Sequence, residues 1–422
     1  MGQSLVVVLN GYDLLKEALV TNEDAFNDRP FVLLDGVIGL AFANGDLWKE
    51  QKAITMTIFR NLGVHTQVMS ERISEIAAIN NDLIGQQKGQ PIDLEEILTL
   101  SITNVVSFIM FGRCFEYDDD RLIKTITYIK SIIVDGDTRN LAAYFPCLSF
   151  LPGDVFKLKK IAEQGRYIMN SFFRENIQKC TSENIDGHNF DNYVTMYNTN
   201  RNQKLEAGKF THLTDESLIM TVYHLFGAGM ETTSTTLKWC ILYFLHYPET
   251  QEKVYREIEQ EVGIHRSPNM ADKNQLNYLK AFIQETQRIT SIFPLSVAHM
   301  CSKTTNLRGY TIPKGTLIIP NLDSVLHEKK IWGENLHIFN PERFLDNTGK
   351  VIFVEEFVPF SLGKRMCPGA AMARMQLFLF LSLMVQRFKF VPSEPGSLPS
   401  LTPQFGLTVS PMRFQVRALE RN

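Results

Sequence analysis

The chain has 422 residues, of which 44% are hydrophobic and 21% are charged, the composition of a globular protein with an extensive core. Its 43 basic and 46 acidic side chains give a formal net charge of −3, so the overall charge does not indicate a nucleic-acid-binding protein. Six scattered cysteines form no Cys-x-x-Cys pair, which is typical of a reducing compartment, and no apolar run approaches the roughly 20 residues of a membrane-spanning helix.

Apolar periodicity predicts a strand and then a series of helices in the first third of the chain. Residues 5–9 are an apolar run followed by Asn10 and Gly11, the pattern of a buried strand and a turn. Several later segments carry apolar residues at three- and four-residue spacing, which predicts amphipathic helices. These segments are residues 13–20, 48–61, 68–86, 94–111 and 121–134.

A long helix is predicted in the middle of the chain, after a polar connection. Residues 178–213 are polar and interrupted by glycine and asparagine, which indicates that they include a long connection. From Thr214, a capping residue followed by two acidic residues, helical periodicity runs to His246 and ends before Pro248. About 33 residues at roughly 1.5 Å each would span about 50 Å, so this helix must cross the molecule.

Strand-like segments are short and come late in the chain, at residues 306–312, 316–320 and 388–392. The first of them ends in Pro313-Lys314-Gly315, a turn sequence. Helices therefore dominate and the sheet is minor. Although the length would allow two or three domains, we expect residues 1–422 to form one large α-rich domain with a small β region.

The strongest chemical signal is the ten-residue segment from Phe360 to Gly369. Cys367 precedes Pro368, a residue favoured at the first position of a helix, and an apolar helical pattern follows as far as Phe388. Free backbone N–H groups and the helix dipole at such a terminus lower the pKa of a thiol and tune the sulfur as a metal ligand. The alternative is a buried free cysteine, the commonest state of this residue. Five fixed positions in one window would arise by chance in about one chain in 10^4, which favours the ligand.

This segment resembles the cysteine loop of the cytochrome P450 superfamily, Phe-x-x-Gly-x-Arg-x-Cys-x-Gly, at each defining position. The resemblance implies the cytochrome P450 fold, mainly α with a minor β region in a single large haem domain. It implies haem b (iron protoporphyrin IX) as cofactor and Cys367 as the axial iron ligand, whose thiolate favours O–O cleavage. Phe360 belongs to the loop, and Arg365 is expected to pair with a haem propionate. Gly363 and Gly369 are expected to allow close backbone approach to the cofactor.

Two glycines, Gly227 and Gly229, lie inside the predicted long helix, where each costs roughly 1 kcal/mol. A kink or an inserted water at these small residues would open a groove beside the cofactor. In the superfamily an acid–alcohol pair at this place relays protons to oxygen in the haem pocket, and Glu231 and Thr232 match that catalytic pair. The alternative is close helix packing through the glycines with a solvated Glu231. The presence of Cys367 favours the catalytic interpretation.

Glu285 and Arg288 are three residues apart and therefore share one face of a helix. Such a pair is usually a weak surface contact. However, Arg343 follows downstream within a Pro-Glu-Arg-Phe sequence. The resemblance implies that these three residues form a buried ionic triad with a structural role and no catalytic one.

Three more residues match superfamily positions that contact the haem propionates. Trp48 begins a Trp-x-x-x-Lys sequence where the superfamily has Trp-x-x-x-Arg, so Lys52 replaces the arginine. Lysine keeps the charge but lacks the bidentate guanidinium, and we expect a weaker contact. His299 matches the third position. A lone histidine is more often structural, and we do not expect His299 to ligate a metal.

The resemblance covers the whole chain and is strongest to the second animal microsomal family, which oxidises xenobiotics, fatty acids and steroids. The segments that carry it are residues 115–119, 145–153 and 308–315. The family's substrate pocket is lined by segments that match residues 31–42, 225–232, 292–297 and 405–408 here. These segments are mostly apolar, as a cavity for a lipophilic molecule should be.

The expected function is therefore that of an oxidoreductase, a haem-thiolate monooxygenase that inserts one oxygen atom from O2 into a lipophilic substrate. No nucleotide-binding fingerprint is present, so electrons are expected from NADPH through NADPH–cytochrome P450 reductase, with cytochrome b5 as a second donor. Lys49, Lys52, Arg60 and Lys364 are expected to form the docking surface. Two alternatives stay open. One is a haem-thiolate isomerase or dehydratase, against which the acid–alcohol pair argues; the other is a haem-binding carrier or sensor without turnover.

The beginning of the chain differs from the microsomal proteins that it resembles, which carry an N-terminal membrane helix, a proline-rich hinge, a first helix and a first strand. Residues 5–9 match the second strand of that sheet, whose open edge would favour aggregation. We expect a truncated fragment or variant of a protein anchored on the cytosolic face of the endoplasmic reticulum membrane. Its own contact with the membrane surface would be weak and rest on residues 145–155.

Overall fold

The computed structural model describes residues 5–30, 39–63, 67–133, 158–183 and 191–421. Within these ranges the chain is mainly helical with a minor β region, as the sequence predicts. The first part of the expected pocket segment 31–42, and the expected membrane-contact stretch 145–155, lie outside the described residues. No helix in the described ranges combines the length and the apolarity needed to span a membrane.

The helices of the first half of the described chain begin with short α1 and α2 and continue with longer elements. They are α1 (Tyr12–Lys16), the π-helical turn η1 (Glu17–Thr21), α2 (Glu23–Phe26), α3 (Gly45–Asn61), α4 (Gln67–Gly85), α5 (Glu95–Phe111), α6 (Asp120–Ile133), α8 (Leu158–Ile168), the π-helical turn η3 (Met169–Arg174), α9 (Glu175–Glu183) and α10 (Tyr193–Glu206).

The second half contains the longest helix of the described residues, α11 (Asp215–His246). Its other helical elements are α12 (Pro248–Glu261), the 3₁₀ turn η5 (Met270–Asn274), α13 (Asn277–Thr290), α14 (Leu322–Leu326), α15 (Lys329–Trp332), the 3₁₀ turns η6 (Pro341–Phe344) and η7 (Gly363–Arg365), and α16 (Ala370–Arg387). The five helical segments predicted in the first third of the chain are confirmed, with boundaries that move by a few residues.

The segment 178–213, expected to include a long connection, also contains helices, because α9 extends to Glu183 and α10 spans Tyr193–Glu206. Residues 184–190 between these helices lie outside the described residues. α10 starts at a capping box, in which the Asn192 side chain accepts from the Thr195 N–H and Thr195 reaches back to the Asn192 N–H. Tyr193, Val194 and Tyr197 on its first turns are buried, whereas most of the rest of the helix is polar. A few apolar residues at one end are therefore enough to dock this helix, and they do not produce a clear periodic signal.

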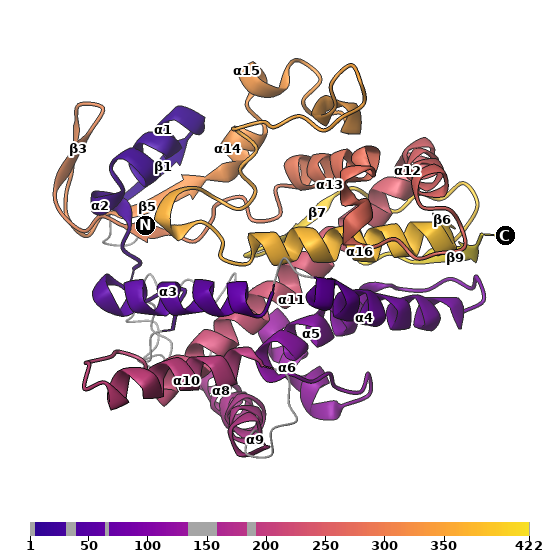
Figure 1. Cartoon of the computed structure of the whole chain (residues 1–422). Helices are drawn as coiled ribbons and strands as arrows, with labels where there is room; N and C mark the ends of the chain where they lie inside the picture. Colours follow the sequence, from indigo (N-terminus) through magenta and orange to yellow (C-terminus); the bar gives the residue numbers. More distant parts are fainter. Residues whose placement is uncertain (1–4, 31–38, 64–66, 134–157, 184–190, 422) are drawn as a thin grey trace.

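Helix α11 is continuous and crosses the middle of the molecule (Figure 1). Thr214 caps it as predicted, through a capping box with Ser217. Near its first half lie α6 and α10, and around its second half lie α12, α13 and α16, with α5 packed along it. This central position explains why so many of its residues are buried on every side.

The two glycines of α11 allow close packing between helices. A Cβ atom at Gly227 would lie 3.2 Å from the Ile129 side chain, and one at Gly229 would lie 3.0 Å from the Val106 side chain. Both distances are tighter than ordinary contacts, so larger residues would push α6 and α5 away from α11. The alternative of helix packing through small residues is thus correct for these glycines.

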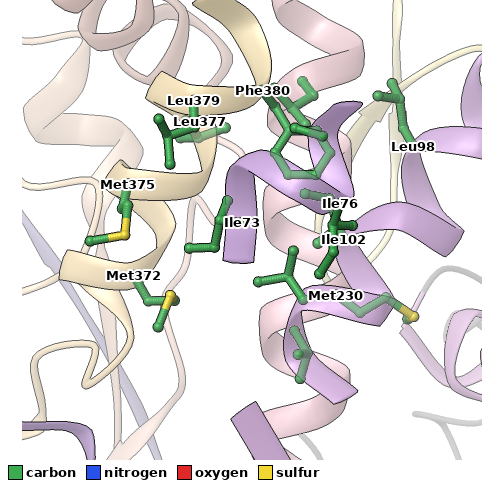
Figure 2. Packing of buried hydrophobic residues seen from close by; sticks show 14 of the residues in the cluster. Ile73, Ile76, Leu98, Ile102, Met230, Met372, Met375, Leu377, Leu379 and Phe380 are labelled. Atoms are coloured by element: carbon green, nitrogen blue, oxygen red, sulfur yellow. The ribbon is translucent and has the colours of Figure 1, made fainter. Parts of the chain in front are cut away.

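One large hydrophobic cluster joins α11 to α4, α5 and α16 (Figure 2). Helix α16 is buried over almost its whole length, which accounts for its nearly continuous apolar sequence. Residues labelled in the figure are Ile73 and Ile76 from α4, Leu98 and Ile102 from α5, Met230 from α11, and Met372, Met375, Leu377, Leu379 and Phe380 from α16. This packing fixes the start of α16, and with it Cys367, relative to the middle of α11.

The strands form small sheets at the periphery of the helical core. They are β1 (Val6–Asn10), β2 (His299–Met300), β3 (Thr305–Leu307), β4 (Tyr310–Ile312), β5 (Leu317–Asn321), β6 (Phe388–Pro392), β7 (Pro403–Phe405), β8 (Val409–Pro411) and β9 (Val416–Glu420). β1 pairs in parallel with β5, and β2 pairs antiparallel on the other side of β5. The remaining described strands pair antiparallel as β3–β4, β6–β9 and β7–β8.

The segment 306–312, predicted as one strand, is in fact part of the β3–β4 hairpin. The chain turns at Arg308 and Gly309, which both have positive φ. Gly309 adopts a φ of +85° without strain because glycine has no Cβ atom. The single-strand prediction overlooked this turn. The sheet β1–β5–β2 is the more important one for the site, because β2 carries His299.

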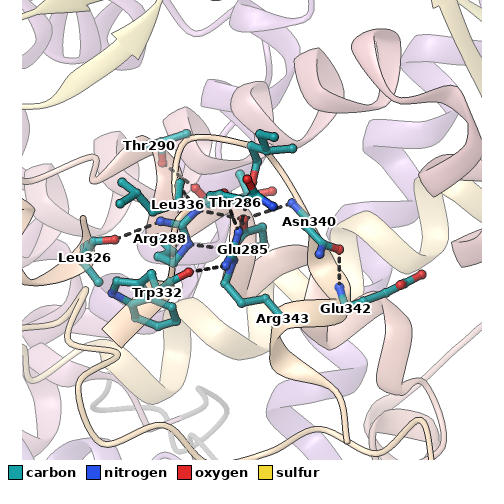
Figure 3. A network of polar contacts seen from close by, with 12 residues as sticks. Glu285, Thr286, Arg288, Thr290, Leu326, Trp332, Leu336, Asn340, Glu342 and Arg343 are labelled. Atoms are coloured by element: carbon teal, nitrogen blue, oxygen red, sulfur yellow. Dashed lines mark hydrogen bonds and ion pairs between the residues drawn. The ribbon is translucent and has the colours of Figure 1, made fainter. Parts of the chain in front are cut away.

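The ionic triad expected from the sequence is present (Figure 3). Arg288 Nε and Nη2 lie 2.7 and 2.9 Å from the two carboxylate oxygens of Glu285, and both side chains have no exposed surface. Arg343 Nε lies 3.5 Å from Glu285 Oε1. Arg288 also donates to the carbonyls of Leu326 and Leu336, so the triad ties α13 to the chain that leads to the cysteine loop.

Candidate functional site

Cys367 lies in a tight loop between η7 and α16. Its backbone N–H donates to the Phe360 carbonyl at 3.0 Å, and the Phe360 ring lies 4.7 Å below the guanidinium of Arg374. Gly363 has a φ of +71°, and a Cβ atom there would overlap the Leu19 carbonyl oxygen. Gly363 is therefore required for packing of the loop against η1, which corrects the expectation that it makes room for a cofactor.

The sulfur of Cys367 faces the first N–H groups of α16. Burial raises the pKa of the Cys367 thiol, whereas the backbone N–H groups of Gly369 and Ala370 and the charge of Arg374 lower it. α16 begins at Ala370 with Gly369 as its N-cap. Pro368 was predicted at the first position of this helix, but it lies just before the helix. The helix terminus still directs its partial positive charge to the sulfur, as a thiolate ligand requires.

Arg365 is held on the other side of the loop by backbone carbonyls and by an aromatic ring. Its Nε donates to the Asn27 carbonyl at 2.9 Å and its Nη2 to the Ala43 carbonyl at 2.7 Å, while its guanidinium lies 3.9 Å from the centre of the Trp48 ring. Burial lowers the pKa of Arg365 to about 10, against the charge of Asp28, which raises it. Its buried Nη1 atom has no hydrogen-bond partner among the described residues.

Arg29 and His299 each have a buried nitrogen atom for which the described part of the chain supplies no partner. Arg29 Nη1 donates to the carbonyls of Val297 and Ala298 at 2.6 and 2.9 Å, which leaves its Nε without a partner. Burial and the charge of Arg365 lower the pKa of Arg29 to about 9. Two guanidinium groups that share a buried environment and keep unsatisfied N–H groups require an anion.

His299 joins this cluster through its second nitrogen. Its Nδ1 lies 2.7 Å from the Phe26 carbonyl and donates to it, and its buried Nε2 has no partner. Burial, together with the charges of Arg29 and Arg365, lowers the pKa of His299 to about 3. A carboxylate bound between the two arginines would counter these charges and favour the protonated ring, whose Nε2 then donates.

The structure places Trp48, Lys52 and Arg365 side by side, and Lys52 contacts the cysteine loop itself. Its Nζ donates to the Lys364 carbonyl in the cysteine loop and lies 5.3 Å from the centre of the Trp48 ring. Burial and the charges of Arg365 and Lys364 lower the pKa of Lys52. Lys52 therefore ties α3 to the loop backbone.

Arg29 and Asn44 are site residues that the sequence did not reveal. Asn44 Oδ1 accepts from the Arg29 backbone N–H at 2.7 Å and from Arg365 Nη2 at 3.2 Å, and its Nδ2 donates to the Arg29 carbonyl at 2.8 Å. The Asn44 amide thus fixes the Arg29 backbone and the Arg365 side chain relative to each other. Neither residue belongs to a motif or a periodic segment, so nothing in a single sequence singles them out.

The catalytic pair expected on α11 is present on two different faces of that helix. Thr232 is partly accessible, and its hydroxyl donates to the Ala228 carbonyl at 2.8 Å. Glu231 is only 2% exposed, so it is not the solvated residue of the alternative interpretation. Its Oε1 accepts from Thr235 at 3.0 Å and from Thr408 at 3.4 Å, and its Oε2 has no partner.

The described parts of the expected pocket segments converge on α11. The Leu40 N–H donates to Thr221 Oγ1 at 3.2 Å, and the Val409 N–H donates to the Ile292 carbonyl at 2.8 Å. Thr408 contacts Glu231. Phe405, on the β7–β8 hairpin, keeps 70% of its surface accessible. Large accessible apolar side chains on converging segments are typical of a wall that a lipophilic ligand covers.

A comparison with protein families decides the identity of this site. The family model described as cytochrome P450 matches residues 1–418. The chain belongs to the cytochrome P450 family.

Individual cytochrome P450 relatives agree with this assignment over nearly the whole chain. Cytochrome P450 2U1 of Homo sapiens is 34% identical over 429 residues, covering 100% of this chain and 78% of that protein. Cytochrome P450 2C16 of Oryctolagus cuniculus is 35% identical over 424 residues, covering 99% and 85%. Steroid 17-alpha-hydroxylase/17,20 lyase of Gallus gallus is 34% identical over 427 residues, covering 99% and 84%. The protein is thus a cytochrome P450 monooxygenase, an oxidoreductase with haem b as its cofactor.

The described residues fit this cofactor. A half-buried sulfur with two backbone N–H groups directed at it suits iron ligation by a thiolate. The unsatisfied nitrogen atoms of Arg29, Arg365 and His299 suit the propionate groups.

Proposed function

We propose that this cytochrome P450 inserts one oxygen atom from O2 into a lipophilic substrate, such as a xenobiotic, a fatty acid or a steroid, with residues 1–422 forming one haem domain. The Cys367 sulfur, half-buried just before α16 with backbone N–H groups directed at it, is the observation that carries the proposal. Bound haem supplies the oxygen-activating chemistry. The protein contributes the thiolate, the proton donors of α11 and an apolar pocket wall. The test is NADPH- and O2-dependent product formation with a reconstituted reductase. Turnover that needs neither NADPH nor O2 would contradict it.

We assign the haem contacts to residues on several elements. Cys367 is the iron ligand, with Phe360 closing its loop. Arg365, His299 and Arg29 direct their free nitrogen atoms to the propionates, and Trp48 supports the Arg365 guanidinium from below. Lys52 supports the loop and contributes positive charge nearby.

We expect Arg29→Leu to increase the rate of haem dissociation by about tenfold or more, because a charged hydrogen bond is worth about 1.5–3 kcal/mol. The rate is measured by haem transfer to an apo-haem acceptor protein. Arg308→Leu is the matched control, since Arg308 pairs with Glu17 at the surface and is 51% exposed. Equal dissociation rates in the two variants would remove Arg29 from the propionate site.

Thr232 and Glu231 are assigned to proton delivery. The Thr232 hydroxyl lies on the accessible face of α11 and can pass a proton into the pocket, while it holds its position through the Ala228 carbonyl. Glu231 stands behind it with one carboxylate oxygen bound by two hydroxyl groups and the other free to accept a proton. In this proposal Glu231 supplies a proton and Thr232 passes it into the pocket.

We expect Thr232→Ala to reduce the fraction of NADPH converted to product by at least about tenfold, with hydrogen peroxide released in its place. Haem content and the spectrum of the ferrous–CO complex should not change, because Thr232 makes no contact with the cysteine loop in the described structure. Thr199→Ala on α10 is the control, as Thr199 makes the same hydroxyl-to-carbonyl bond within a helix. If Thr232→Ala converts the same fraction of NADPH to product as the unaltered protein, Thr232 has no role in proton delivery.

We propose that electrons come from NADPH–cytochrome P450 reductase, with cytochrome b5 as a second donor, at the face formed by α3 and the cysteine loop. Lys49, Lys52, Arg60 and Lys364 lie on these elements. Lys49 pairs with Asp46 and Lys364 with Glu23, but such surface pairs are weak and exchange readily with a partner's acidic groups. We place the protein at the cytosolic face of the endoplasmic reticulum membrane, where the microsomal family that it resembles works.

A further inference from the structure

Two histidines lie next to each other on the chain that leads from β5 to the cysteine loop. His327 directly follows α14, and His337 lies a few residues before η6. Their ring centres are 6.0 Å apart, and the two ring planes differ by only 20°. His337 is exposed and His327 keeps 19% of its side-chain surface accessible, so an ion can reach this pair from solvent.

The buried ionic triad brings the two histidines together. Arg288 Nη1 donates to the Leu326 carbonyl at 3.0 Å, and Arg288 Nη2 donates to the Leu336 carbonyl at 2.7 Å (Figure 3). Each of these carbonyls belongs to the residue that immediately precedes one of the histidines. One fully buried guanidinium thus holds the two backbone segments beside each other. A pair of ligands that is held in place in advance loses less conformational freedom when it binds.

Asp323 fixes the orientation of the His327 ring. The Nδ1 atom of His327 lies 3.0 Å from Asp323 Oδ1 and 3.3 Å from the Asp323 backbone carbonyl, and both are acceptors. Nδ1 therefore carries the proton, and in the neutral ring the lone pair is on Nε2, on the other side of the ring. A histidine that donates to a carboxylate through one nitrogen and ligates a metal through the other is a recurrent arrangement, because the carboxylate fixes the tautomer and raises the basicity of the ligand.

The separation of the two rings suits one metal ion between them. A metal–nitrogen bond is about 2.0 Å long and the nitrogen lies roughly 1 Å from its ring centre, so a shared ion allows ring centres up to about 6 Å apart. Imidazole suits Zn²⁺, Cu²⁺ and Ni²⁺, whereas Mg²⁺ and Ca²⁺ prefer oxygen ligands. Within the described ranges no three His, Cys, Asp or Glu side chains are grouped to hold a metal. The protein would thus supply two ligands, and water would supply the others.

We propose that His327 and His337 form a surface binding site for a divalent metal ion of the zinc type, with Asp323 as a positioning residue. Each histidine follows a carbonyl that Arg288 binds, so the ion would join the same two segments a second time. Because this ion binds the folded chain, it stabilises the fold next to the triad. The inference is independent of the monooxygenase proposal and of the haem site.

Isothermal titration calorimetry with Zn²⁺ tests the site in the haem-loaded protein, prepared without a polyhistidine tag. We expect one Zn²⁺ per chain at this site, and His337→Ala should weaken its binding at least about tenfold. Asp323→Ala should weaken it by about 10–100-fold, the usual effect of removing the outer partner of a ligating histidine. Asp323→Asn keeps an acceptor for Nδ1 and should retain more of the affinity. Mg²⁺ should not compete with Zn²⁺.

His265→Ala is the matched control, since His265 is an exposed histidine in the loop after α12. It should bind Zn²⁺ like the unaltered protein, and the ferrous–CO spectrum should be the same in all variants. Saturating Zn²⁺ should also raise the urea concentration at half-unfolding of the unaltered protein and of His265→Ala, but not of His337→Ala. Equal Zn²⁺ affinity of His337→Ala and the unaltered protein overturns the inference, as does an equal effect of Zn²⁺ on their unfolding.

Discussion

Replacing Cys367 by serine should abolish the red-shifted absorption band of the ferrous–CO complex and eliminate product formation. That band requires a thiolate on the iron, and a serine hydroxyl is a much weaker ligand that stays protonated in a buried site. The loop itself should survive, because it is closed by the Cys367 backbone N–H on the Phe360 carbonyl and by the contact of Gly363 with Leu19. Difference spectra of the reduced protein with and without CO provide the measurement.

Cys114→Ser is the matched control for this experiment. Cys114 is an exposed free cysteine after α5, and its sulfur contacts the Asn104 carbonyl. Its loss should leave the band and the activity unchanged. A thiolate-type band in Cys367→Ser would show that another residue ligates the iron. Circular dichroism of both variants separates loss of the ligand from loss of the fold.

The parts of this fold that the sequence predicts are those that depend on local chemistry. The cysteine loop is a short motif, and its chemistry is fixed within ten residues. Thr214 starts α11 through a side chain three positions from its partner, and the apolar repeat carries the helix as far as His246. Glu285 and Arg288 meet because they are one helical turn apart.

The parts that the sequence does not predict depend on contacts between distant segments. Arg29 reaches the site because the carbonyls of Val297 and Ala298 and the amide of Asn44 converge on it. Gly227 and Gly229 suggested a kink, but their role depends on which side chains of α5 and α6 face them. Gly363 likewise depends on the Leu19 carbonyl, more than 300 residues away in the chain. Local propensity cannot encode such neighbours, and tertiary packing decides.

Replacing Glu285 by alanine should lower the free energy of unfolding by about 3–5 kcal/mol, the usual cost of leaving a buried charge without its partner. This is a large share of the roughly 5–15 kcal/mol that stabilises a typical domain. The change leaves Arg288, with no exposed side-chain surface, and Arg343 without their shared carboxylate, and it also removes an acceptor for the Asn340 N–H. Urea unfolding followed by circular dichroism, together with the yield of haem-loaded protein, measures the effect.

Lys253→Ala is the control for Glu285→Ala, because Lys253 pairs with Glu342 on the same 3₁₀ turn that carries Arg343. Both partners of that pair are about half exposed, at 52% and 58%, so its loss should cost less than about 1 kcal/mol. In the fraction of Glu285→Ala that folds, the coupling of NADPH consumption to product should equal that of the unaltered protein, since the triad holds the fold and touches neither Thr232 nor Cys367. Lost coupling at normal stability would instead give Glu285 a catalytic role.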